Sequence, residues 1–227
     1  MLTVEELYLL LTRSNGDPEV FGLRFGPGLN AALLTDLVDA ARVTVLGDAP
    51  PRLRVLSTTP TGALVADFGL ELIADRDGHK VESVVRSGRF NPEVAVVASL
   101  VQAEVLEYGP RKLLGFGMRR TIERDPEPKR RIRGRLAEVF AWDRAPTAGD
   151  ATILAALYAM GVAAQLLHDL SDAESADEFE SALKALVARA PSPGGEVSRA
   201  VLDLQLARGV KDPRGDTPGT GGSGPVL

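Results

Sequence analysis

Hydrophobic residues recur along the chain at the three- and four-residue spacing of amphipathic helices, and the first predicted helix is the best defined. Its apolar face collects Val4, Leu7, Leu10 and Leu11. Thr3 is placed to cap the first amides and Glu6 to reach back to the Thr3 N–H, so we predict a capping box at these two residues. The turn residues Asn15–Asp17 end the helix.

The same spacing predicts further helices along the rest of the chain. They are expected over residues 29–41, 63–74, 80–86, 94–106, 129–140, 147–167, 175–190 and 195–207. In the helix predicted over residues 29–41, Asp36 and Asp39 are expected to lie opposite the apolar face. Asn91 and Pro92 are placed to begin the helix over 94–106, as its cap and its first helical residue.

Short segments between the helices alternate in the manner of strands. Val43–Val45 and a returning segment Leu53–Val55 flank a Gly/Pro turn and predict a β-hairpin. A second hairpin is predicted from Leu113–Phe116 and the returning segment Met118–Ile122. These hairpins are small beside the helical segments, so helices are expected to dominate the fold.

Composition agrees with a soluble globular protein, because the chain is 44% hydrophobic and 25% charged. Together with the pattern, it predicts a mainly α fold: a single helical-bundle domain over residues 1–210 with one or two short β-hairpins. Residues 211–227 are rich in Pro, Gly, Ser and Thr and have little to bury. We expect them to form a disordered tail.

The sequence also limits the cellular setting. There is no cysteine, which excludes disulfides and thiolate chemistry. No apolar run approaches the roughly 18 residues that span a bilayer. Glu5 and Glu6 come early and no basic segment precedes them, which does not fit a secretory signal. We therefore expect a cytoplasmic protein, either free or peripheral on the cytoplasmic face of the membrane.

Motifs of known enzymes are missing from the sequence. It has no HExxH, GxSxG or Walker A pattern, and only two histidines, His79 and His168. The glycines between residues 22 and 28 follow no predicted strand and precede no Lys-Ser/Thr pair, so a loop is the better interpretation. We predict no catalytic residue, no metal site and no cofactor.

Basic residues are concentrated between Arg119 and Arg135, where eight of them face only three acidic residues in a protein of net charge -5. One interpretation is a surface for anionic lipid, because arginine binds phosphate oxygens bidentately. The other is a helix face that pairs with the protein's own acidic residues. A nucleic-acid site is less favoured because the chain is acidic overall and the segment lacks interleaved aromatics.

The order of several elements resembles the Golgi phosphoprotein 3 family, in a bacterial form. The matching segments are Leu2–Leu11, Gly28–Leu37, Val43–Val45, Pro60–Gly62 with the helix after it, Leu113–Met118 and Ile153–Leu167. The resemblance covers roughly Leu2 to Leu167. It implies a mainly helical domain without enzymatic activity, a shallow basic pocket for a phosphatidylinositol 4-phosphate head group beside a hairpin, and a flat membrane-facing surface. It also implies self-association and an adaptor role for membrane enzymes.

The resemblance further implies a head-group site that is only partly retained. Phe21 stands where the family has a tryptophan, and Asn30 where an arginine is expected. Two expected basic positions fall near Phe90 and Glu93. The lipid-binding residues predicted for this chain are Phe21, Arg24, Arg86, Arg89, Arg119 and Arg120. Phe25 and Met118 are expected to add apolar contact with the membrane.

Three functional hypotheses follow from the sequence. The first is a non-enzymatic peripheral membrane or adaptor protein that binds an anionic phospholipid or phosphoinositide head group. The second is a soluble scaffold or regulatory protein that has lost lipid recognition and acts through a protein partner or a second copy of itself. The third and least favoured is a nucleic-acid binder that uses the basic segment.

Overall fold

The computed structural model describes residues 1–47, 50–109 and 120–204. Within these residues the chain forms ten α-helices, two short 3-10 helices and two antiparallel hairpins. The helices are α1 (Thr3–Leu11), α2 (Gly26–Asp39), α3 (Leu64–Ile73), η1 (Ala74–Arg76), α4 (Val81–Val85), α5 (Glu93–Gln102), α6 (Glu127–Phe140), α7 (Ala148–Ala159), α8 (Ala163–Leu167), η2 (His168–Leu170), α9 (Ala176–Ala188) and α10 (Gly195–Leu202). The strands are β1 (Val43–Leu46), β2 (Arg52–Val55), β3 (Leu106–Tyr108) and β4 (Thr121–Glu123).

The prediction of a mainly α fold with short hairpins is confirmed. Strands β1 and β2 pair with Val43 opposite Val55, as the alternating pattern indicated. In the second hairpin, Leu106 of β3 pairs with Glu123 of β4. The predicted strand over residues 113–116 and the predicted tail over residues 211–227 lie outside the described residues.

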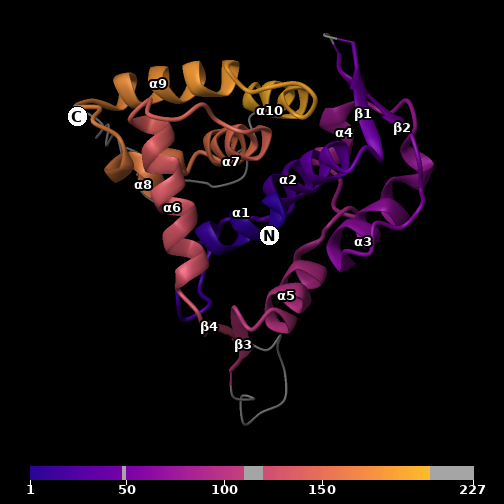
Figure 1. The fold of residues 1–227 in the computed structure, drawn as a ribbon, viewed down its shortest axis with the longest axis horizontal. Coiled ribbons are helices and arrows are strands. Elements are labelled where there is room, and N and C mark those ends of the chain that lie inside the picture. Colours follow the sequence, from indigo (N-terminus) through magenta and orange to yellow (C-terminus); the bar gives the residue numbers. More distant parts are fainter. Residues whose placement is uncertain (48–49, 110–119, 205–227) are drawn as a thin grey trace, which may run out of the picture.

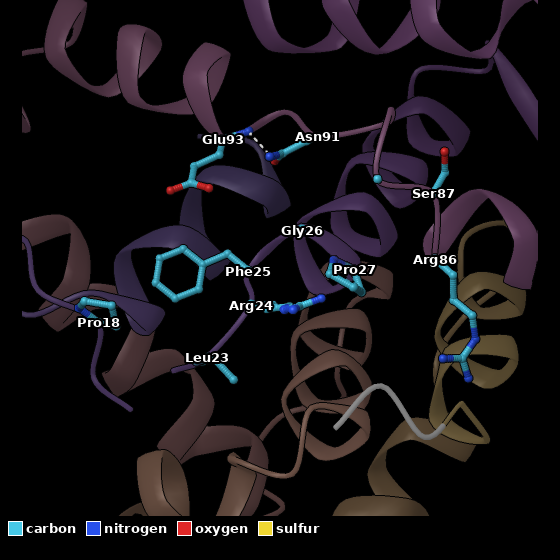
Figure 2. Close-up of a pocket in the computed structure, with 11 residues that line it drawn as sticks. Pro18, Leu23, Arg24, Phe25, Gly26, Pro27, Arg86, Ser87, Asn91 and Glu93 are labelled. Carbon is cyan, nitrogen blue, oxygen red and sulfur yellow. Dashed lines mark hydrogen bonds between the residues drawn. The ribbon is translucent and has the colours of Figure 1, made fainter. Parts of the chain in front are cut away.

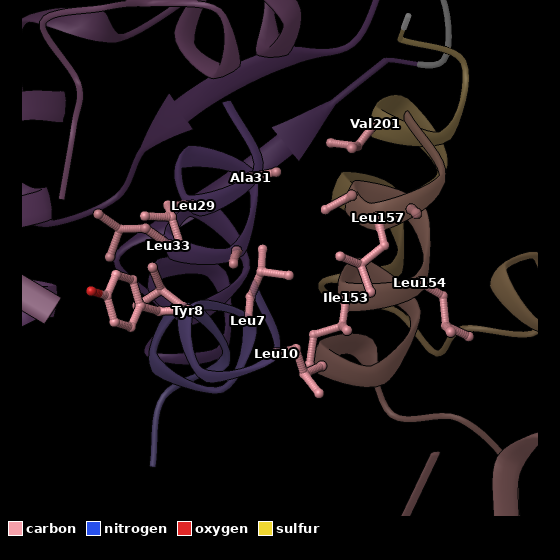
Figure 3. Packing of buried hydrophobic residues seen from close by; sticks show 14 of the residues in the cluster. Leu7, Tyr8, Leu10, Leu29, Ala31, Leu33, Ile153, Leu154, Leu157 and Val201 are labelled. Atoms are coloured by element: carbon pink, nitrogen blue, oxygen red, sulfur yellow. The ribbon is translucent and has the colours of Figure 1, made fainter. Parts of the chain in front are cut away.

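The core lies where α1, α2, α7 and α10 pack against one another. Figure 3 shows Leu7 and Leu10 of α1 facing Ile153 and Leu157 of α7, and all four are buried. Gly28 of α2 lies against the side chain of Met160, just after α7, and a Cβ at Gly28 would come within 2.4 Å of its sulfur. Burial of a leucine or isoleucine contributes about 1.5–3 kcal/mol, so this cluster is the main source of stability.

Two arms extend from this core and end at the same hairpin. Figure 1 shows α6 on one side and α3 and α5 on the other, both running toward the β3–β4 hairpin with α1 between them. The arm of α3 and α5 is held by packing of α3 on α2 and of α5 on α1. The loop after α1 and the turn before α5 are thereby brought to one region of the molecule.

The predicted capping box at the start of α1 is wrong, because the helix takes its cap from elsewhere. The Asp36 carboxylate of α2 accepts hydrogen bonds from the N–H groups of Thr3 (2.7 Å) and Val4 (3.0 Å). Glu5, rather than Glu6, accepts the Leu2 N–H at 2.8 Å. Asp36 is therefore buried, contrary to its predicted place on the polar face. An acidic side chain at this position also complements the helix dipole.

Three predicted helix boundaries differ in the structure. The helix expected over residues 147–167 is divided into α7 and α8, because Gly161 between them adopts a φ of 72° that a continuous helix does not allow. Helix α5 ends at Gln102 because Leu106 belongs to strand β3. Helix α2 starts at Gly26, so part of the expected glycine-rich loop is helical, with Pro27 in the first turn where its missing N–H costs nothing.

Candidate functional site

A cavity of about 450 Å³ lies between the α1–α2 loop and the α4–α5 turn (Figure 2). It is lined by Pro18, Leu23, Arg24, Phe25, Gly26, Pro27, Arg86, Ser87, Gly88, Asn91 and Glu93. Residues from one loop therefore form one wall, and residues from a turn about sixty positions later form the other. Two of the predicted lipid-binding residues, Arg24 and Arg86, meet at this cavity.

The α1–α2 loop is fixed to strand β4 before it reaches the cavity. The Ser14 hydroxyl donates to the Glu123 carboxylate at 2.7 Å, and the Glu123 N–H donates to the Ser14 carbonyl at 2.8 Å. Gly16 lies against Thr121 with a φ of 77°, and a Cβ at Gly16 would come within 1.9 Å of the Thr121 carbonyl oxygen. Only glycine fits this close approach, so the sequence fixes the path of the loop here.

The opposite wall is fixed from below by Asn30 of α2. Its side-chain amide donates to the carbonyl oxygens of Val85 (2.8 Å) and Ser87 (3.2 Å), and the residue is 1% exposed. Its Oδ1 atom has no hydrogen-bond partner among the described residues. Asn30 stands where the resemblance led us to expect a head-group arginine. In this chain it positions the turn that carries Arg86 and Ser87.

Phe25 forms the apolar floor of the cavity. It is buried, and its ring meets Tyr8 edge-on with the ring centroids 5.9 Å apart. The prediction that Phe25 contacts a membrane is therefore wrong. Met118, the other expected apolar contact, lies outside the described residues.

The cavity carries charge of both signs. Arg24 is exposed and forms no ion pair with a described residue. The Arg86 Nε lies 3.0 Å from the Glu82 carboxylate, one helical turn earlier. On the other wall, Glu93 is half-buried, and this burial raises the pKa of its carboxyl above the ordinary value. The Glu93 N–H donates to the Asn91 side-chain oxygen at 3.2 Å, which fixes the start of α5.

Exposed apolar side chains flank the cavity. Phe21 is 98% exposed and Val94 is 72% exposed, the largest values among the large hydrophobic residues of the described chain. Phe21 lies two residues before the cavity residue Leu23, and Val94 follows the cavity residue Glu93. Sequence reasoning singled out Phe21 but missed Val94. The available signal was that Val94 lies off the helix face that buries Val96 and Leu100.

The remaining predicted site residues lie outside this cavity. Arg89 is exposed in the α4–α5 turn and does not line the cavity. Arg120 forms an ion pair with Asp17, next to the cavity residue Pro18. Arg119 lies outside the described residues.

The basic segment is paired with the protein's own acidic residues throughout its described part. The pairs are Arg120–Asp17, Arg124–Glu104, Lys129–Glu19, Arg130–Glu127, Arg131–Glu127, Arg133–Asp169, Arg135–Glu6 and Arg135–Asp150. Most of these acidic partners come from distant parts of the sequence. Of the two interpretations, self-pairing therefore describes most of this segment.

Arg135 forms the most buried of these contacts. Its guanidinium binds Glu6 of α1 and lies 2.8 Å from Asp150 of α7, whose side chain is fully buried. Asp150 also accepts from Arg144 (2.8 Å) and from the Thr147 N–H (2.9 Å). The hydrogen bonds to Glu6 hold the pKa of Arg135 above its ordinary value. This network joins α1, α6 and α7.

A second cavity, of about 370 Å³, lies between the β1–β2 hairpin, α4 and α10. Its charged lining comprises Lys80, Glu82, Glu196, Arg199 and Asp203. Carboxylates outnumber cations in this set, which makes it a poorer place for a phosphate. The cavity beside Phe21 is therefore the candidate functional site.

Neither a helix able to cross a bilayer nor a group of three or more side chains suited to holding a metal ion occurs in residues 1–47, 50–109 and 120–204. These features define a mainly α protein with a shallow charged cavity at the edge of its helical core.

The family follows from comparison with known proteins. The family model described as Golgi phosphoprotein 3 (GPP34) matches residues 4–205, and the chain belongs to this family. The resemblance seen in the sequence is thereby confirmed and extended to the last described helix. A search of the curated proteins found no match to the chain.

Proposed function

We propose that this chain is a non-enzymatic peripheral membrane adaptor that binds phospholipid through the cavity surface, meaning Phe21, Arg24, Arg86, Arg89 and Val94. One observation carries the proposal: the two most exposed large hydrophobic side chains of the described chain flank a cavity that holds Arg24, which forms no ion pair with a described residue. Exposed apolar groups beside cations are the combination that holds proteins at anionic membrane surfaces. Family membership supports the adaptor role.

The expected affinity follows from these few groups. A cation near an anionic membrane contributes about 1 kcal/mol, so Arg24 and Arg89 together give about 2 kcal/mol. Burial of the Phe21 side chain adds about 1.5–3 kcal/mol. The sum of roughly 4–5 kcal/mol corresponds to dissociation constants near 1 mM or somewhat below. We therefore expect weak, reversible binding that falls with salt.

Vesicle co-sedimentation tests the proposal. Wild-type protein should sediment with vesicles containing phosphatidylglycerol at low salt. The double variant Arg24→Glu/Arg89→Glu and the single variant Phe21→Ser should each lose most of this binding. Arg131→Glu is the matched control, because Arg131 is exposed, lies in the basic segment and pairs only loosely with Glu127 at 3.8 Å. The proposal is contradicted if Arg131→Glu reduces binding as much as the double variant does.

A soluble scaffold that has lost lipid recognition is the second candidate. The internal pairing of the basic segment favours it, since that segment offers a membrane few unpaired cations. Wild-type protein that fails to sediment with any anionic vesicle at low salt would support this candidate. Light scattering and pull-down would then identify a second copy or another protein as the partner.

A further inference from the structure

The cavity is lined by both a cationic side chain, Arg24, and an acidic one, Glu93, and this combination limits which head group it can bind. We infer that the cavity selects a phosphate ester that also bears an ammonium group, the chemistry of phosphoethanolamine, over a head group with several phosphates. The inference rests on the proposed function, since it names the group that the proposed membrane site takes. Figure 2 shows the Arg24 guanidinium and the Glu93 carboxylate on opposite sides of Phe25.

The cationic wall is suited to a single phosphate. Arg24 makes no ion pair with a described residue, so its planar guanidinium can bind two phosphate oxygens at once. Arg86 also lines the cavity, but Glu82 already balances its charge at 3.0 Å. The wall therefore offers about one uncompensated positive charge, which matches the single negative charge of a phosphodiester.

The anionic wall is suited to an ammonium group. The Glu93 side chain forms neither a hydrogen bond nor an ion pair with any described residue, although it is half-buried. Partial burial without a counter-ion disfavours its charged form, and the raised pKa of Glu93 agrees with this. An ammonium group bound beside it would supply the missing counter-ion. A second phosphate would instead be repelled by the carboxylate.

The rest of the lining fits the short link between the two charges. Phe25, Pro27 and Leu23 give apolar contact for methylene groups, and the Ser87 hydroxyl offers a further polar partner. The volume of about 450 Å³ lies within the usual range of small-ligand sites. Phe25 is the one aromatic residue in the described lining, so the cavity lacks the aromatic cage that recognises quaternary ammonium groups. A primary ammonium that donates hydrogen bonds to Glu93 is thus preferred over choline.

Calorimetry with soluble head groups tests the inference on the wild-type chain. Glycerophosphoethanolamine should bind about tenfold or more tightly than glycerophosphocholine and inorganic phosphate, as expected for one charged hydrogen bond. Equal binding of the three ligands, or tighter binding of inositol phosphate, would overturn the inference. This comparison needs no variant and so does not depend on how a substitution folds.

Two variants assign the preference to its residues. Glu93→Gln should remove the preference for the ethanolamine ester and leave phosphate binding in place, whereas Arg24→Gln should weaken all phosphate ligands. Glu71→Gln is the matched control, because Glu71 is an exposed acidic residue of α3 outside the cavity lining. A preference that persists in Glu93→Gln would contradict the assignment.

Vesicles separate this inference from the proposed function and identify the source of the ligand. Preferential sedimentation with vesicles containing phosphatidylethanolamine, beyond that with phosphatidylcholine, supports a lipid head group. Binding of the soluble ester without any vesicle binding supports a free phosphoethanolamine ester and refutes the membrane role. Sedimentation with anionic vesicles regardless of ethanolamine content upholds the proposed function and overturns the inference.

Discussion

Gly16 allows a direct test of how the candidate site is held in place. Its φ of 77° is matched by Gly22 in the same loop, but the two glycines differ in their surroundings. A Cβ at Gly16 would lie 1.9 Å from the Thr121 carbonyl oxygen, whereas a Cβ at Gly22 would meet nothing within 4 Å. The variants Gly16→Ala and Gly22→Ala therefore share the backbone cost and differ in the steric clash.

The magnitudes follow from this difference. A left-handed backbone destabilises an alanine by about 1–2 kcal/mol. The lower entropy of the unfolded alanine variant offsets about half of this loss in the free energy of unfolding. We expect Gly22→Ala to lose roughly 1 kcal/mol. Gly16→Ala must also move the loop off β4 and give up the two hydrogen bonds between Ser14 and Glu123, each worth about 1 kcal/mol. Its expected loss is therefore about 3 kcal/mol.

Urea denaturation measures both losses as shifts of the transition midpoint at constant slope. Gly16→Ala should also weaken vesicle binding, because the loop that it displaces carries Phe21 and Arg24. The reasoning is refuted if the two variants lose equal stability, or if Gly16→Ala keeps full stability.

Three further predictions concern residues that position the core and the cavity wall. Arg135→Met should lower the free energy of unfolding by about 3–5 kcal/mol because it removes one cation from the fully buried Asp150, and chemical denaturation of wild type and variant measures the loss. Asn30→Leu should cost about 1–3 kcal/mol and increase hydrogen exchange in the α4–α5 turn, because the buried Val85 carbonyl and the partly buried Ser87 carbonyl lose their donor. Burial raises the pKa of Asp36 from 3.8 to about 7, so the folded state binds this proton more tightly than the unfolded state. The stability that Asp36 contributes is thus complete below about pH 4 and is lost as the pH rises toward 7, by up to about 1.4 kcal/mol per pH unit. Asp36→Asn should remove this part of the pH dependence, which denaturation at a series of pH values measures.

Helices and the first hairpin could be predicted because their signals are local. The spacing of leucines in α1 and the turn after Val43–Val45 are contained in a few neighbouring residues. The cap of α1 could not be predicted in this way, because its acceptor is Asp36, 33 positions beyond Thr3. The local box expected at Thr3 and Glu6 is shifted to Leu2 and Glu5, and the tertiary contact with Asp36 takes the N–H groups of Thr3 and Val4.

The candidate site was predictable only in part, for the same reason. The sequence identified Phe21, Arg24 and Arg86 individually, mainly through the family resemblance. It could not show that Arg24 shares a cavity with Glu93, because their proximity depends on how α2 packs against α4 and how α1 packs against α5.

The ion-pair partners of the basic segment could not be predicted from the sequence either. Its acidic partners include Glu6 and Glu19, which lie 129 and 110 positions away from Arg135 and Lys129. Charge counts alone left two interpretations open, and the three-dimensional contacts favour self-pairing.

The central claim is that the cavity surface beside Phe21 meets the membrane. It is tested most directly by placing a fluorophore at that position: Phe21→Trp in a background where the single native tryptophan is replaced by Trp142→Phe. Anionic vesicles should shift the emission to the blue, and brominated lipid should quench it, because a side chain that is 98% exposed in solution would enter the bilayer interface. Unchanged emission under conditions where the protein sediments with the vesicles would contradict the account.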